Sequence, residues 1–185
     1  CFFFFFSNTQ AELTRQYQNV SKIPLLVSID VDCGLGMRLK QDGFYFPKQL
    51  TLGAVQDNKL IYQMGKQMAA QLKFLGIHLN FAPVLDINNN PNNPVINERS
   101  FGSDKILVTN KSYAYMQGLQ DGGILACAKH FPGHGDTDMD SHEALPTLNQ
   151  EKNQLDTLEL FPFRVLCSKD IASVMVGHLA IPKLE

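Results

Sequence analysis

Short apolar runs recur along the chain at a nearly constant interval. LLVSI begins at Leu25, IHLNFAPVLDI at Ile77, ILACA at Ile124 and ASVMV at Ala172, so that successive runs start about 50 residues apart. Each run is short and continuous, which is typical of a strand that is covered on both faces. The pattern therefore predicts four buried strands.

Residues between these runs follow the three-to-four spacing of amphipathic helices. The first helix has six apolar positions at this spacing: Leu60, Ile61, Met64, Met68, Leu72 and Leu75. Asp57 is suited to cap its start and Gly76 to end it. A second helix is predicted from near Asp104 to Gly122-Gly123, with four residues facing inward: Ile106, Tyr113, Met116 and Leu119.

A third helix is predicted to begin near Glu151, with Leu155 and Leu158 on its apolar side. Pro162 must break or restart it, because proline cannot donate a backbone hydrogen bond inside a helix. The alternation of strand and helix predicts an α/β fold with a parallel sheet. An open doubly wound sheet and a (β/α)₈ barrel both fit. Dinucleotide binding is disfavoured, because CGLGMR at residues 33–38 lacks the third glycine of that motif.

The run CFFFFF at residues 1–6 is interpreted as a further buried strand. It could instead be the end of a signal peptide, but no charged region precedes it and residues 7–10 are not a small-residue cleavage site. The chain begins at Cys1 and stops at Glu185, soon after an apolar run. We expect it to be a piece of a longer protein.

Composition narrows the choice of partners. The chain is 18% charged with a net charge of -2 and has no basic cluster, which argues against nucleic acid as a partner. Its longest apolar run is far shorter than the roughly 20 residues that a membrane-spanning helix needs. The four cysteines show no CxxC spacing, and Cys127 and Cys167 are predicted to be small core residues.

Polar residues follow the predicted strands. Asp30 and Asp86 end the first two strands, Lys129 and His130 end the third, and His178 follows the fourth. Parallel sheets form their active sites at the carboxyl ends of strands, so residues far apart in sequence should converge at one mouth.

The stretch KHFPGHGDTDMDSH at residues 129–142 admits four interpretations. Alternating Asp136, Asp138 and Asp140 resemble the start of a calcium loop, although Ser141 and Thr147 replace the glycine and glutamate that such a loop needs. His130, His134 and His142 could bind zinc, although HFPGH lies on a loop rather than a helical face. Both metals stay open.

Proton transfer is the third interpretation of this stretch. An aspartate at position 140 within reach of His142 would fix the tautomer of the imidazole and stabilise its charged form. Such a pair could give a proton to a leaving group and later take one from water. The fourth interpretation is a solvated loop in which these side chains only form turns.

Several other polar residues could hold a sugar. Lys129 at a strand end needs partners to offset its desolvation, and substrate hydroxyls would serve, unless the side chain reaches the solvent at the rim. Arg38 and Arg99 offer forked donors for hydroxyls or a carboxylate, although Arg99 could simply pair with Glu98. Asp30 could accept two hydroxyl hydrogen bonds or cap a loop. The stretch NNNPNNP at residues 88–94 is expected to shape a pocket rim without carrying chemistry.

Together these motifs resemble the bacterial β-N-acetylhexosaminidase branch of glycoside hydrolase family 3. The match includes KHFPGHG followed by DSH, LNFAPVLDI, ERSFG, and LLVSID with Arg38 eight residues after Asp30. It covers nearly the whole chain, from Ile23 to Pro182. The resemblance implies a (β/α)₈ TIM barrel that removes terminal β-linked N-acetylglucosamine with retention and needs no cofactor or metal. A β-glucosidase of the same family and a noncatalytic sugar-binding module are the alternatives.

The resemblance also implies roles for individual residues. His142 would be the general acid/base and Asp140 the partner that orients it. The sugar would be held by five residues: Asp30, Arg38, Arg99, Lys129 and His130. Two features depart from the family pattern: Asp32 stands where the family commonly has glutamate, and the nucleophilic aspartate would follow a strand beyond His178, outside the chain.

Residues 1–185 are therefore expected to be an incomplete N-terminal barrel domain, inactive by itself, with peptidoglycan fragments or related glycans as substrates of the whole enzyme. A further downstream domain is compatible with the resemblance. Members of the family occur in the cytoplasm and as exported proteins, so the resemblance does not assign a compartment.

Overall fold

The computed structural model describes residues 7–137 and 145–184. The run CFFFFF and the residues Asp138 to Ala144 lie outside the described residues. The strands are β1 (Ser28–Ile29), β2 (Leu79–Asn80), β3 (Leu125–Phe131) and β4 (Ser173–Val176). The α-helices are α1 (Ser7–Val20), α2 (Gln49–Gly53), α3 (Asn58–Phe74), α4 (Lys105–Asp121), α5 (Lys152–Thr157) and α6 (Leu160–Cys167). Short 3₁₀ turns are η1 (Leu35–Met37), η2 (Asn97–Arg99) and η3 (Pro182–Leu184).

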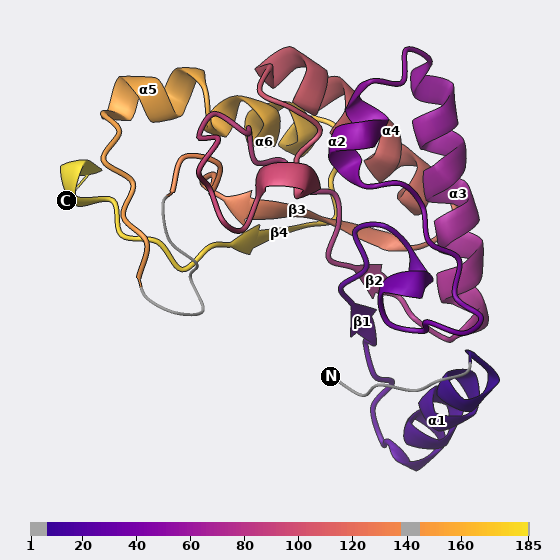
Figure 1. Cartoon of the computed structure of the whole chain (residues 1–185). Helices are drawn as coiled ribbons and strands as arrows, with labels where there is room; N and C mark the ends of the chain where they lie inside the picture. Colours follow the sequence, from indigo (N-terminus) through magenta and orange to yellow (C-terminus); the bar gives the residue numbers. More distant parts are fainter. Residues whose placement is uncertain (1–6, 138–144, 185) are drawn as a thin grey trace.

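The four strands form one parallel sheet in the order β1-β2-β3-β4. A doubly wound sheet reverses its strand order at a switch point, whereas a barrel adds each new strand beside the preceding one. The sequential order decides between the two arrangements that the sequence allowed. The fold is a partial (β/α)₈ barrel, with α2, α3, α4 and α6 on one side of the sheet (Figure 1).

Strand β2 is shorter than the apolar run that predicted it. Pro83 has no backbone N–H to donate, and regular pairing ends before it. Contact with β3 nevertheless continues, because the amide of Cys127 donates to the carbonyl of Ala82 at 2.8 Å and the amide of Leu85 donates to the carbonyl of Lys129 at 2.6 Å. The segment after β2 therefore stays beside β3 as far as Leu85 and Lys129.

Helix α3 begins at its predicted cap, Asp57, and α4 begins beside Asp104, where its start was predicted. The carboxylate of Asp57 accepts from the amide of Lys59 at 2.9 Å, and that of Asp104 accepts from the amide of Leu107 at 2.7 Å. Gly76 follows α3 with a φ of 71°, a conformation that favours glycine. Both predicted helices are confirmed.

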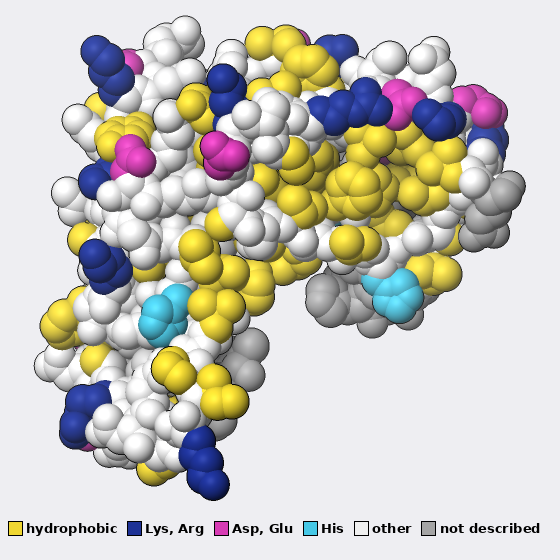
Figure 2. Space-filling view, turned by 180° about the vertical axis from the view of Figure 1, so that it is seen from behind, with side chains coloured by type: hydrophobic (Ala, Val, Ile, Leu, Met, Phe, Trp, Pro, Cys, Tyr) yellow, Lys and Arg dark blue, Asp and Glu magenta, His cyan; other side chains and the backbone are white. Residues whose placement is uncertain are grey.

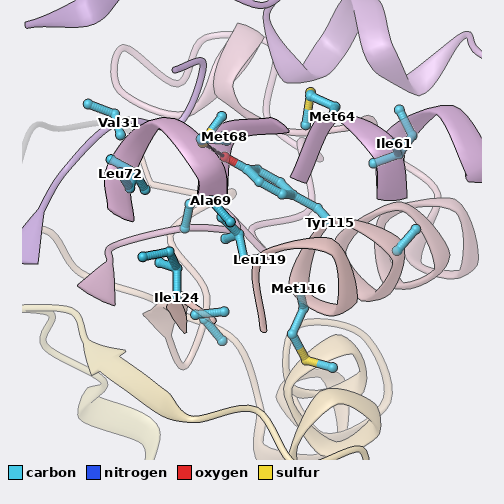
Figure 3. Close-up of a cluster of buried hydrophobic side chains, with 14 of the residues drawn as sticks. Val31, Ile61, Met64, Met68, Ala69, Leu72, Tyr115, Met116, Leu119 and Ile124 are labelled. Atoms are coloured by element: carbon cyan, nitrogen blue, oxygen red, sulfur yellow. Dashed lines mark hydrogen bonds between the residues drawn. The ribbon is translucent and has the colours of Figure 1, made fainter. Parts of the chain in front are cut away.

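The core lies between these two helices and the sheet (Figure 3). Tyr115 extends from α4 into this core and is fully buried, and its hydroxyl lies 2.9 Å from the sulfur of Met68 on α3. Leu60 and Ile106 were predicted to face inward, but both are largely exposed. Each sits in the first turn of its helix. In these turns the side chains that enter the core are those of Ile61 and Val108, which are 1% and 0% exposed.

Burial on both faces holds for β2 and for residues 126–129 of β3, but not for the outer strands. Leu26 beside β1 is 65% exposed and Val176 in β4 is 73% exposed. Hydrophobic side chains accordingly gather on the face seen in Figure 2. The prediction of fully covered strands is wrong for β1 and β4 because each has a neighbouring strand on one side only within the described residues.

Two further expectations concern the C-terminal half. Helices α5 and α6 are separate, and Pro162 is the third residue of α6, where a missing N–H costs no helical hydrogen bond. The break expected at this proline is thus confirmed. Cys127 is buried as predicted, but Cys167 is exposed at the end of α6, so its assignment to the core is wrong. No helix within the described residues is long and apolar enough to cross a membrane.

Helices α3 and α4 approach each other closely at two glycines. A Cβ atom added at Gly118 would lie 2.2 Å from the carbonyl oxygen of Tyr62, and one added at Gly65 would lie 2.7 Å from that of Tyr115. These distances are too short for any side chain, so the helices would have to separate. The glycines are therefore required by packing rather than by backbone conformation.

The first prediction is that Gly118→Ala lowers the free energy of unfolding by about 1–3 kcal/mol, as overpacking does. Elsewhere in a helix the same substitution would stabilise by about 1 kcal/mol. The sign is therefore diagnostic, and urea unfolding of the variant measures it. Gln67→Ala, at an exposed position of α3, is the control and should change stability little. A variant as stable as the original chain would contradict the close approach.

Candidate functional site

The central feature of the candidate site is a buried lysine held between two carboxylates. The Nζ atom of Lys129, in β3, lies 2.6 Å from Asp30 Oδ1 and 2.8 Å from Asp32 Oδ1. The side chains of Lys129 and Asp32 are 1% and 2% exposed, whereas that of Asp30 is 42% exposed. Lys129 does not reach the solvent at the rim, because the carboxylates meet its ammonium group inside the protein.

Two arginines extend this charged cluster. Arg99 Nε lies 3.0 Å from Asp32 Oδ2, so Asp32 is bound by two cations. Arg38 Nε donates to the carbonyl oxygen of Asp30 at 3.0 Å, and its guanidinium lies 3.9 Å from the carboxylate of the same residue. The surface pair of Arg99 with Glu98 is absent among the described contacts, and Glu98 binds Lys48 instead.

The charges of the cluster outweigh the effect of burial on Asp32. Burial alone would raise the pKa of this carboxyl, but the charges of Lys129 and Arg99, with the hydrogen bonds from both, hold its pKa below the ordinary value. The pKa of Arg99 is raised in turn, because Asp32 outweighs the opposing effect of burial. Asp32 and Arg99 are therefore both held in their charged forms, and their ion pair fixes the positions of the two side chains.

Neutral groups of the core hold the backbone beneath Asp32. The side chain of Asn80 in β2 accepts from the amide of Val31 at 3.2 Å and donates to the carbonyl of Val31 at 3.3 Å. The hydroxyl of Tyr115 donates to the carbonyl of Asp32 at 2.9 Å. These hydrogen bonds hold the backbone that follows β1, so the carboxylates of Asp30 and Asp32 are attached to a fixed segment.

Asp86 organises the loop that follows β3. Its buried carboxylate accepts from the backbone N–H groups of His130 and His134, the latter at 2.7 Å, and lies 2.6 Å from Nδ1 of His130. Burial would raise the pKa of Asp86, but these contacts, led by the charge of His130, lower it. The carboxylate favours a proton on Nδ1 of His130 and leaves Nε2 for other contacts.

Close packing fixes the rest of this loop. A Cβ atom at Gly135 would lie 1.7 Å from the carbonyl oxygen of Ile87, so only glycine fits there. Asn93 is 2% exposed, and its amide donates to the carbonyl of His134 at 2.7 Å. The Oγ1 atom of Thr137 lies 2.6 Å from Nδ1 of His134. The stretch at residues 88–94 thus braces the loop.

The predicted residues fall into two groups. Asp30, Arg38, Arg99 and Lys129 belong to one cluster of contacts, and His130 directly follows Lys129 in β3. Asp140 and His142 lie outside the described residues, so the proposed dyad stays a prediction.

Two central residues were not among the predicted site residues. Asp86 ends an apolar run just as Asp30 does. That position at the end of a predicted strand is the sequence feature that could have identified it as a site residue. Asp32 stood out only as a departure from a family pattern. No local signal distinguished it as the buried partner of two cations, because Lys129 and Arg99 are 97 and 67 residues away.

The metal hypotheses also reach beyond the described residues. The calcium loop needs Asp138 and Asp140, and the zinc site needs His142. Within residues 7–137 and 145–184, no group of three or more His, Cys, Asp or Glu side chains could hold a metal ion. The rings of His130 and His134 lie 6.0 Å apart, and one nitrogen of each already faces Asp86 or Thr137. Both hypotheses stay predictions.

The arrangement offers polar groups of both kinds at one end of the sheet. Asp30 presents a half-exposed carboxylate that can accept hydroxyl hydrogen bonds, and Arg38 and Arg99 keep partly exposed donors. A sugar ring carries hydroxyls that donate and accept hydrogen bonds. An acceptor on one side and donors on the other can therefore hold the ring in one orientation. The buried Lys129 and Asp32 keep these outer groups in place.

Comparison with known proteins agrees with this geometry. The family model described as the glycosyl hydrolase family 3 N-terminal domain matches residues 7–185. A solved family 3 β-N-acetylglucosaminidase from Paenibacillus sp. str. FPU-7 is 42% identical with a TM-score of 0.92; the match covers 97% of this chain and 35% of that one. NagZ from Neisseria gonorrhoeae, solved with N-trifluoroacetyl-D-glucosamine, is 31% identical with a TM-score of 0.92, covering 98% and 56% respectively.

Curated relatives point in the same direction. Beta-hexosaminidase A from Pseudoalteromonas piscicida is 35% identical over 191 residues, which cover 97% of this chain and 31% of the relative. Beta-hexosaminidase LpqI from Mycobacterium tuberculosis is 39% identical over 166 residues, covering 88% and 42%. The chain thus spans about a third to a half of the curated relatives that it matches. With its partial barrel and its charged cluster at the strand ends, the chain belongs to glycoside hydrolase family 3.

Proposed function

We propose that the protein containing this chain is a retaining β-N-acetylhexosaminidase that removes terminal β-linked N-acetylglucosamine, with peptidoglycan fragments or related glycans as substrates. The observation that carries the proposal is the anchored loop after β3. It begins in the charged cluster at Lys129, is fixed by Asp86, and leads directly to the sequence DSH at residues 140–142. Relatives named β-hexosaminidases support the substrate class.

Five residues hold the terminal sugar in this proposal. Asp30 accepts hydrogen bonds from ring hydroxyls, while Arg38, Arg99 and His130 donate to oxygens of the sugar. Lys129 lies deeper, and its main contribution is to hold Asp30 at the mouth, although it can also face a hydroxyl. Hydrogen bonds to charged groups are worth about 1.5–3 kcal/mol each, so a few of them suffice for a selective sugar site.

His142 acts as the acid and base, and Asp140 orients it. In the first step the imidazolium gives its proton to the leaving oxygen while a carboxylate attacks C1 and forms a glycosyl ester. In the second step the neutral imidazole takes a proton from a water molecule that attacks C1, and the carboxylate leaves. Histidine suits both steps because its ordinary pKa of about 6.5 allows both protonation states near neutrality.

The nucleophilic carboxylate is proposed to follow a barrel strand later than β4, outside residues 1–185. Activity tests therefore use a protein that extends through that strand. Residues 1–185 by themselves are expected to turn over a β-N-acetylglucosaminide negligibly, since they lack the group that forms the intermediate. Measurable turnover by this segment alone would contradict the assignment of the nucleophile.

The second prediction is that His142→Ala in the extended protein lowers kcat by about 10²–10⁴-fold, the usual contribution of general acid–base catalysis. Binding of N-acetylglucosamine should change little, because the residues that hold the sugar are retained. Turnover of an aryl β-N-acetylglucosaminide and calorimetric binding of the free sugar measure the two effects.

The control for this variant is His78→Ala, which removes an exposed histidine at the opposite end of β2. It should leave turnover unchanged. A parent protein that binds the sugar without any turnover would indicate a noncatalytic binding module. A parent that prefers β-glucosides would indicate a β-glucosidase, and activity abolished by a chelator would indicate a metal-dependent hydrolase.

The third prediction is that Asp30→Asn weakens binding of N-acetylglucosamine by about 10-fold or more, as loss of a charged acceptor does. Folding should survive, because this side chain is half exposed and Lys129 keeps Asp32 as a partner. Asp121→Asn, at the end of α4, is the control for loss of an exposed aspartate and should bind the sugar normally. Unchanged affinity of the Asp30 variant would remove this residue from the sugar site.

A further inference from the structure

A buried glutamate lies beneath the loop that follows β3. Glu159, at the junction between α5 and α6, is 3% exposed. It is the residue that precedes α6, yet its side chain makes no capping hydrogen bond there. No ion pair with a cation involves it among the described residues. A buried carboxyl group without a cation is costly when ionised, so its surroundings call for an explanation.

One hydrogen bond links Glu159 to the loop after β2. The amide nitrogen of Asn89 donates to Oε1 of Glu159 at 3.3 Å. Oε2 of Glu159 and Oδ1 of Asn89 are both buried and have no hydrogen-bond donor within the described residues. The two side chains therefore share one hydrogen bond and have one unpaired oxygen each.

A proton on Glu159 would supply the one donor that this pair of side chains lacks. A neutral carboxylic acid has one acceptor and one donor, and a primary amide has the complementary pair. If Oε2 carries a proton, it can donate to Oδ1 of Asn89 while Oε1 accepts from the amide nitrogen. An ionised carboxylate cannot do this, because it has only acceptors and would leave Oδ1 of Asn89 without a donor.

Burial and a neighbouring negative charge favour the neutral form of Glu159. Burial, the largest cause, raises the pKa of Glu159, and the nearby charge of Asp136 adds to this effect. Hydrogen bonds from its own backbone N–H and from Asn89 act in the opposite direction, but the pKa stays raised. On the helical side, Asp156 and Arg164 are paired with each other. The carboxylate of Asp136 accepts from the side chain of Gln150.

The loop after β3 rests directly on this side chain. A Cβ atom added at Gly133 would lie 2.9 Å from Cβ and 3.2 Å from Cγ of Glu159. Gly133 has a φ of 134°, which L side chains rarely adopt. Glu159 thus contacts the loop midway between His130 and Asp136, while Asn89 ties it to the stretch that also braces His134 through Asn93.

We propose that Glu159 is a positioning residue that, as a neutral acid paired with the amide of Asn89, holds the loop carrying His130 and His134 in its working position. The inference rests on the proposed function for its effect on turnover. The pairing itself is a property of folding and does not depend on which reaction the protein performs. Glu159 touches no reacting atom in this proposal.

The pairing has a defined pH dependence. A carboxyl whose pKa is higher in the folded than in the unfolded chain binds more protons when folded. Its contribution to stability is present below the ordinary glutamate pKa and is lost as the pH rises through the raised folded value. Glutamine is the uncharged isostere, and its amide can make both hydrogen bonds with Asn89 at every pH.

The fourth prediction compares Glu159→Gln with Glu159→Ala in the extended protein. The glutamine variant should keep kcat/KM within about twofold of the parent at mildly acidic pH, and the alanine variant should lose tenfold or more, because it removes both hydrogen bonds and the support for Gly133. Glu151→Gln, which neutralises an exposed glutamate of the same region, should have no effect. Glutamine as damaging as alanine, or alanine without effect, would overturn the proposal.

Equilibrium unfolding of the same proteins between pH 4 and 8 supplies a second measurement. The stability of the parent relative to Glu159→Gln should fall as the pH rises above the ordinary glutamate pKa, with a limit of about tenfold in the unfolding constant per pH unit. A parallel dependence in both proteins would overturn the neutral acid. This readout needs no turnover, so it still tests the pairing if the parent fails to cleave the sugar.

Discussion

The ammonium group of Lys129, held between Asp30 and Asp32, is the interaction on which the candidate site depends. Burying one charge in a protein costs several kcal/mol unless opposite charges and hydrogen bonds meet it. Here two carboxylates face one lysine, and Arg99 supplies the second positive charge for Asp32. The inner charges are thus balanced where water is excluded, while the carboxylate of Asp30 extends to the half-exposed mouth. Strands β1 and β3 do not pair directly, so this contact joins their ends across the chain beside β2.

The carboxylate of Asp86 fixes the loop after β3, just as Lys129 joins the ends of β1 and β3. Asp86 receives two backbone N–H groups and the imidazole of His130, and so converts a segment rich in glycine and proline into a fixed structure. Ile87 and Asn93 also contact this loop, and Glu159 contacts it from the junction between α5 and α6. Loops that carry function are usually positioned by a rigid scaffold. In this chain the scaffold includes polar side chains from three separate segments as well as the strands.

The close packing of α3 and α4 also helps to position the charged cluster. Tyr115 reaches from α4 past Met68 to the backbone carbonyl of Asp32, so the helix layer and the charged cluster share one side chain. Gly65 and Gly118 allow the two helices to come close enough for this contact. The apolar core therefore positions the site directly, and a change in the spacing of these helices would be felt at Asp32.

The sequence by itself determined the strand–helix repetition, the cap at Asp57, the start of a helix near Asp104, the break before Pro162 and the position of Asp30 at a strand end. Lys129 was expected to end the third strand and lies two residues before the end of β3. These features depend on neighbouring residues, so local periodicity and side-chain chemistry reveal them. It could not separate a barrel from an open sheet, because strand order depends on pairing between distant segments. Nor could it predict the exposure of Leu60, Ile106 and Cys167, which depends on what each helix packs against. Only the tertiary structure decided that Asp32 lies between Lys129 and Arg99, that Asp86 holds His130, and that Glu159 lies under Gly133, because charges and carboxyl groups find partners by distance in space rather than by separation along the chain.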